Sequence, residues 1–162
     1  MTFITEEIIE GVGDTLGLHP ERYGQLVEEF QASQPELMAF LVSDDTSFLT
    51  VHERDYLLYL GLVIWEAVRQ KNPKIALVKA EQIGKAEDTN WQKLEAVKAR
   101  TFRERMDVFF VDYPQEDLLA FVEDVLTPDE ESPITKEGRE ALFVALKTLI
   151  DVIAVEQSQK TS

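Results

Sequence analysis

The feature that most constrains the fold is a long segment that is apolar on all sides. Between residues 56 and 68, one glycine and one glutamate are the only interruptions in an apolar run. Thr50 and Glu53 precede the run at the spacing of a capping box, and Asn72-Pro73 follows it. The pattern predicts a helix from about residue 50 to 71. A helix that is apolar almost all round lies at the centre of a domain, so other helices must cover it.

The rest of the chain supplies those helices. Apolar residues recur at three- and four-residue spacing along most of its length, which is typical of amphipathic helices. We expect an all-α fold, a compact bundle of about six to seven helices, in a single domain over residues 1–157 with a frayed polar tail at 158–162. One helix is expected over residues 74–85, and another from Trp91 to about residue 111. Residues 88–90 between them are expected to form a break or the N-cap of the second helix.

Two parts of the sequence are similar to each other. The six residues that begin at Glu36 read ELMAFL, and the six that begin at Asp117 read DLLAFV. An acidic loop and a threonine follow each motif, and the helices expected after Thr50 and Thr135 run together at a constant offset of 85 residues. An internal repeat of this kind is the mark of a duplicated unit, although similar amphipathic helices can also produce such matches by chance.

The repeat predicts two pseudo-repeated three-helix units, residues 20–72 and 98–157, packed around two central apolar helices. At the offset of 85, Glu66 matches Asp151. The residues expected in the shared core are Leu57, Leu60, Ile64, Leu142, Leu146 and Leu149.

The polar residues that stand out are two arginines and the acidic loops before them. Arg54 matches Arg139, and each lies one turn into an otherwise apolar helix. An arginine there must keep its guanidinium solvated or paired, so we expect a clamp on a carboxylate of either loop. A surface for a partner, or an anion site between the halves, is the alternative. The candidate carboxylates are Asp44, Asp45, Asp129, Glu130 and Glu131, or Glu66 and Asp151 if the pairing crosses between the halves.

Common catalytic and metal-binding motifs are missing from the sequence. The chain has no cysteine, which excludes disulfides, thiolate nucleophiles and cysteine-ligated metals. Its two histidines, His19 and His52, lack the partner spacing of helical metal sites. The acidic loops offer oxygen ligands for Ca²⁺ or Mg²⁺, but without the spacing of an EF-hand. We therefore expect no catalytic residue, no bound metal and no cofactor.

The charge of the chain is large and unevenly distributed. Its 31 acidic and 16 basic residues give a net charge of −15. Residues 1–53 hold eleven acids and one base, residues 106–135 nine acids and no base, and residues 69–105 ten bases and five acids. A field of this sign repels nucleic-acid phosphates and anionic membranes, and no apolar run is long enough to cross a bilayer. We expect neither nucleic acid nor membrane as a partner.

These features favour a non-enzymatic acidic interaction domain that binds a protein partner, one with a basic surface. The alternative is a small-molecule-binding or enzymatic helical protein with an apolar pocket between the repeat halves. A closed core favours the first function, whereas a pocket with convergent polar groups favours the second. The N-terminal residues do not resemble a signal peptide, so we expect a cytoplasmic protein. The sequence leaves open whether the chain forms a homodimer.

Overall fold

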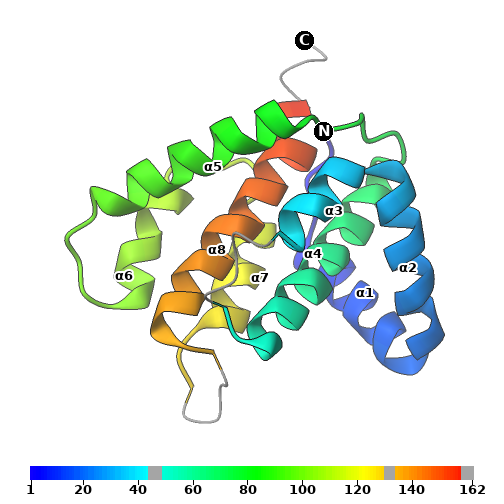
Figure 1. The fold of residues 1–162 in the computed structure, drawn as a ribbon, viewed down its shortest axis with the longest axis horizontal. Coiled ribbons are helices and arrows are strands. Elements are labelled where there is room, and N and C mark those ends of the chain that lie inside the picture. The colour runs from blue at the N-terminus through cyan, green and yellow to red at the C-terminus, as the bar shows by residue number, and fades with distance from the viewer. Residues whose placement is uncertain (44–48, 130–133, 158–162) are drawn as a thin grey trace.

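A computed structural model describes residues 1–43, 49–129 and 134–157 of the chain. Within these ranges the protein forms eight α-helices and no strand, which confirms the all-α prediction (Figure 1). The number of helices is higher than the six to seven predicted. The tail 158–162 lies outside the described residues, as do Asp44, Asp45, Glu130 and Glu131.

The helices follow one another along the chain with connections of one to nine residues. They are α1 (Glu6–Leu18), α2 (Pro20–Ser33), α3 (Pro35–Leu41), α4 (Val51–Lys71), α5 (Ala80–Glu95), α6 (Phe102–Met106), α7 (Glu116–Leu126) and α8 (Lys136–Ile150). A 3₁₀ turn, η2 (Asp107–Phe110), continues α6, and a π-helical turn, η3 (Asp151–Val155), continues α8.

The centre of the molecule is formed by α4 and α8, which pack against each other. Helices α1, α2 and α3 contact α4, while α5 and α7 contact α8 (Figure 1). Because each central helix is covered on several sides, it needs apolar residues nearly all round. The six residues predicted to lie in the core are each at most 1% exposed, which confirms the prediction. They are Leu57, Leu60, Ile64, Leu142, Leu146 and Leu149.

One carboxylate caps both central helices at their N-termini. Glu53 is 1% exposed, and one of its oxygens accepts the Thr50 backbone N–H at 2.9 Å, which completes the predicted capping box. The other oxygen accepts the Thr135 backbone N–H at 2.7 Å and the Thr135 hydroxyl at 2.9 Å. Burial raises the pKa of Glu53, but these hydrogen bonds outweigh it and hold the pKa below its ordinary value. Gly138 leaves room for the carboxylate, which a Cβ at that position would overlap.

The predicted helix over residues 74–85 begins later, because residues 74–79 are not helical. Buried glutamine side chains make their backbone hydrogen bonds instead. Gln34 accepts the Val78 N–H at 2.9 Å and donates to the Ala76 carbonyl at 3.0 Å, and Gln157 accepts the Ala76 N–H at 2.8 Å. Contacts with distant residues therefore override the local preference for helix.

The break expected at residues 88–90 does not occur, since these residues lie inside α5. Asn90 is 1% exposed and donates to the Thr148 hydroxyl of α8 at 3.1 Å, so tertiary packing holds the helix intact there. The chain leaves the helix instead at residues 96–101, and the helix predicted from Trp91 to 111 is divided.

Candidate functional site

Arg139, one of the two predicted clamp residues, is buried and bonded to backbone carbonyls. It is 9% exposed, and its guanidinium donates to the Leu126 carbonyl at 2.6 Å and to the Ile134 carbonyl at 3.3 Å. These carbonyls belong to the end of α7 and to the residue before the Thr135 cap of α8. Arg139 therefore joins the end of one helix to the start of the next.

Arg54, the position matched to Arg139, is exposed. Within the described ranges its side chain makes no hydrogen bond or ion pair. Of the five loop carboxylates named as partners, Asp129 alone is described, and it is exposed. The carboxylate clamp stays a prediction, because its other four loop acids lie outside the described residues.

A groove lined by carboxylates lies where α1 packs beside α7. Its volume is about 300 Å³, and among the described residues its lining contains acidic and apolar side chains but no basic one. Arg103 reaches one of these acids, Asp124, at a distance of 3.5 Å. The lining residues are Glu6, Ile9 and Glu10 from α1, and Asp117, Ala120, Phe121 and Asp124 from α7.

The N-terminal segment is tied to the start of α7, which fixes the shape of this acidic groove. A carboxylate oxygen of Asp117 accepts the Glu6 backbone N–H at 3.0 Å. The side chain of Gln115, which is 3% exposed, accepts the Ile4 N–H at 3.0 Å and donates to the Thr2 carbonyl at 3.1 Å. Both walls are therefore held by hydrogen bonds between segments more than 100 residues apart.

The carboxylates of the acidic groove repel one another. The charge of Glu10 is the main cause that raises the pKa of Glu6 above its ordinary value, and Asp117 and Asp124 add to it. A cation placed among these side chains would relieve the repulsion. The groove therefore favours a positively charged group.

A second group of polar residues meets where α5 and η2 pack near the end of α8. We call it the Asp151 cluster, made of Asp151, Lys147, Asn90 and Tyr113. The Lys147 ammonium donates to both Asp151 oxygens, at 2.8 and 3.0 Å, and to the Asn90 amide oxygen at 2.9 Å. The Tyr113 hydroxyl donates to Asp151 at 2.6 Å, and the Asn90 amide nitrogen at 3.0 Å. Each carboxylate oxygen thus accepts two hydrogen bonds.

Burial changes the acid–base properties of the Asp151 cluster. The Lys147 side chain is 5% exposed, and burial, against the opposing effect of Asp151, lowers the pKa of its ammonium. Burial and the neighbouring Asp151 charge raise the pKa of the Tyr113 hydroxyl well above its ordinary value. At neutral pH the hydroxyl therefore stays protonated and available as a donor to Asp151.

A surface pocket of about 380 Å³ opens over the Asp151 cluster, and all four cluster residues contribute to its lining. The backbone is irregular at two points of this pocket. Asp112 has a φ of 52°, in the left-handed region that non-glycine residues seldom adopt, and the π-helical turn η3 begins at Asp151. Both features are concentrated at functional sites more often than elsewhere.

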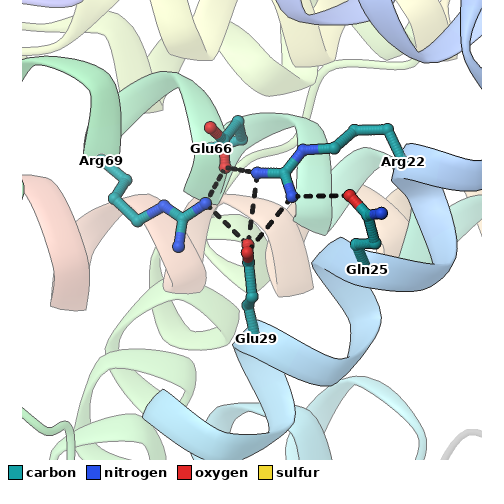
Figure 2. Close-up of polar contacts among 5 residues, drawn as sticks. All are labelled: Arg22, Gln25, Glu29, Glu66 and Arg69. Atoms are coloured by element: carbon teal, nitrogen blue, oxygen red, sulfur yellow. Dashed lines mark hydrogen bonds and ion pairs between the residues drawn. The ribbon is translucent and has the colours of Figure 1, made fainter.

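A third polar cluster joins α2 to α4, and Figure 2 shows it. We call it the Glu66 cluster, made of Glu66, Glu29, Arg22, Arg69 and Gln25. Arg22 donates to both oxygens of Glu29 at 3.2 Å, and Arg69 donates to Glu29 at 2.8 Å and to Glu66 at 2.6 Å (Figure 2). Arg22 also lies 3.7 Å from Glu66 and 3.3 Å from the Gln25 amide oxygen. Two guanidiniums and two carboxylates balance each other, an arrangement suited to joining helices.

Sequence interpretation did not identify Lys147, Asn90 or Tyr113 as functional candidates. Lys147 did carry a detectable pattern. It is a cation within the largely apolar stretch of residues 141–150, and Asp151 follows four residues later, at the spacing of a helical ion pair. Asn90 and Tyr113 reach the cluster from other segments, and nothing in the local sequence marks them.

Within the described ranges, no group of three or more histidine, cysteine, aspartate or glutamate residues is placed to hold a metal ion. Nor does any described helix combine the length and apolarity needed to cross a membrane. Comparison of the chain with protein-family models, curated proteins and solved structures gives no match.

Proposed function

We propose that the protein is a non-enzymatic interaction domain whose acidic groove, between α1 and α7, binds a basic segment of a partner protein. The supporting observation is the lining of the groove, in which four carboxylates occur together with the apolar residues Ile9, Ala120 and Phe121. A lysine or arginine side chain matches both parts, because its charged end pairs with carboxylates while its methylene stem packs on apolar surface.

The charge of the whole chain supports the same class of partner. A net charge of −15 accelerates the approach of a basic protein and disfavours nucleic acids. The carboxylates then make the contacts that hold the basic segment in place. A cytoplasmic location stays a prediction from the sequence.

The experiment compares two variants with the same change in charge. The groove variant combines Glu6→Gln, Glu10→Gln and Asp124→Asn, and leaves unchanged Asp117, which bonds the start of α1. The control variant neutralises three exposed acids of α5, namely Glu81→Gln, Asp88→Asn and Glu95→Gln. The probe is a lysine-rich octapeptide, with binding followed by NMR chemical shifts of the labelled protein at 0.15 M salt.

The peptide should shift the amide signals of α1 and α7 in the wild type and in the control. Its affinity should fall at least about tenfold in the groove variant, equivalent to ~1.4 kcal/mol, and by much less in the control. Equal losses in both variants, or shifts spread over the whole surface, would contradict the proposal. Capture of partners from lysate with the same three proteins extends the test to natural ligands.

We also propose that the two halves of the chain derive from one duplicated three-helix unit. Both central helices begin at a threonine cap, Thr50 and Thr135, and both caps bond to Glu53. If the two halves have a common origin, the different environments of Arg54 and Arg139 mean that these two positions have diverged since the duplication. Homologues whose halves are more alike would support the duplication, and homologues with unrelated halves would contradict it.

A further inference from the structure

We propose that the pocket over the Asp151 cluster binds a small zwitterion of the amino-acid class, with an apolar side chain. This pocket shares no lining residue with the acidic groove, so the proposal stands apart from the binding of a basic partner. It also differs from the pocket expected from the sequence. Its lining includes α5, which lies outside both repeat halves, and it is partly polar.

The α5 wall of the pocket suits a carboxylate. Lys85 and Lys93 lie two turns apart on the same face of α5, and both line the pocket, as does Thr89 between them. The charge of Lys93 acts on Lys147 and contributes, after burial, to lowering its pKa. An anion at this wall would offset the repulsion between the ammonium groups of Lys93 and Lys147.

The remaining walls suit an ammonium group and an apolar side chain. Asp112 and Glu156 add carboxylates to the lining, from the segment after η2 and from the residue that follows η3. Phe109 and Val155 supply apolar surface. A lining that carries both signs of charge around apolar surface is complementary to a molecule that carries both signs itself. A volume of about 380 Å³ is at the small end of ligand pockets and fits a single amino acid.

The Asp151 cluster forms a rigid base for this pocket. The three protons of Lys147 are all donated within the cluster, to Asp151 and Asn90. Lys147 therefore acts on the ligand through its charge, and the direct contacts come from the exposed side chains Lys85, Lys93 and Asp112. The proposal is one of binding, with no chemical step.

The experiment uses leucine as the probe, together with two blocked forms of it. N-acetyl-leucine lacks the ammonium group and leucinamide lacks the carboxylate, while the side chain is the same in all three. Titration followed by NMR should give saturable shifts for leucine at residues 85–93 and 108–113. Each blocked form should bind at least about tenfold more weakly, because each leaves one set of charges in the pocket without its partner.

Two lysine variants locate the site. Lys93→Gln should weaken leucine binding about tenfold. The matched control Lys98→Gln changes an exposed lysine that does not line the pocket, and it should leave the affinity unchanged. Both positions are exposed, so neither change should unfold the protein.

Three outcomes would overturn the proposal. The first is the absence of saturable shifts with leucine and also with a smaller and a larger amino acid, glycine and phenylalanine. The second is a blocked form that binds as well as leucine. The third is an equal effect of the two lysine variants on leucine binding. The groove variant Glu6→Gln, Glu10→Gln, Asp124→Asn should bind leucine normally, which separates failure of this proposal from failure of the acidic groove.

Discussion

Glu66 and Asp151 stand at positions related by the offset of 85, and their side chains are equally covered, 15% and 14% exposed. Their partners differ. Glu66 meets the guanidiniums of Arg22 and Arg69, which also bind Glu29 (Figure 2). Asp151 meets one ammonium, one hydroxyl and one amide.

The difference lies in the burial of those partners. Arg22, Arg69 and Glu29 have side chains that are 28%, 26% and 40% exposed, so water can replace a lost contact. Lys147 is 5% exposed as a side chain and Asn90 1% as a residue, so water replaces a lost contact less easily in the Asp151 cluster. The exposure of a carboxylate therefore does not by itself set its contribution to stability, which depends on the groups left behind when it is removed.

The largest expected effect comes from Asp151→Ala. The change leaves the Lys147 ammonium buried without its counter-charge, and the free energy of unfolding should fall by about 3–5 kcal/mol. The matched change Glu66→Ala leaves guanidiniums that keep Glu29 and solvent, and should cost under about 1.5 kcal/mol. Urea denaturation at pH 7 measures both. Equal losses would show that partner burial does not distinguish the two clusters.

Glu53 sharpens the comparison, because its partners are backbone N–H and hydroxyl groups and not cations. Glu53→Gln should cost about 1–3 kcal/mol at pH 7, since the amide cannot accept hydrogen bonds at both ends. The pKa of Glu53 is lowered on folding, so its contribution is present above the unfolded value of 4.5 and is lost as the pH falls through and below it.

The difference in free energy of unfolding between the wild type and Glu53→Gln should therefore decrease from pH 5 to the lowest pH at which both proteins fold. Urea denaturation at several pH values measures this difference. The control is Glu137→Gln, an exposed acid in the first turn of α8. A gap that is independent of pH would contradict the shared cap as its cause.

A smaller effect is expected from Tyr113→Phe, which removes the 2.6 Å hydrogen bond to Asp151. The loss should be about 1–1.5 kcal/mol. Because folding raises the pKa of Tyr113 above 10, the stability linked to its proton is present below pH 10 and is lost as the pH rises further. Absorbance of tyrosinate at 295 nm should show Tyr113 titrating only on unfolding. If the folded wild type titrated more tyrosines than the folded Tyr113→Phe variant, this prediction would be contradicted.

The parts of the fold that were predicted correctly depend on local patterns. Apolar periodicity was enough to identify the core positions of α4 and α8, and the spacing of Thr50 and Glu53 was enough for the capping box. The parts that were missed depend on contacts between distant segments. Gln34 and Gln157 hold residues 74–79 out of a helix from positions more than 40 residues away. No periodicity can show such contacts.

The same reason explains why one candidate site was easier to predict from the sequence than the other. The acidic groove was partly predictable, because acidic residues are dense in the stretches that form α1 and α7. The Asp151 cluster was not, because Asn90 and Tyr113 reach Asp151 across 61 and 38 residues. Asn90 and Tyr113 each have an ordinary local interpretation, because each lies where the sequence predicts that a helix is interrupted or ends.

The smallest expected effect concerns the Glu66 cluster. In a double-mutant cycle of Arg69→Ala and Glu29→Ala, the coupling energy should be under about 1 kcal/mol, because both side chains are partly solvated. Arg69→Ala alone should cost more than this coupling, since Arg69 also lies 4.4 Å from the centroid of the buried Trp65 ring. Arg100→Ala, at an exposed position, is the control and should change stability by less than about 0.5 kcal/mol. A coupling as large as the loss in Asp151→Ala would show that a solvated cluster of four charges can match a buried pair, and the comparison would then depend on the number of charges and not on their burial.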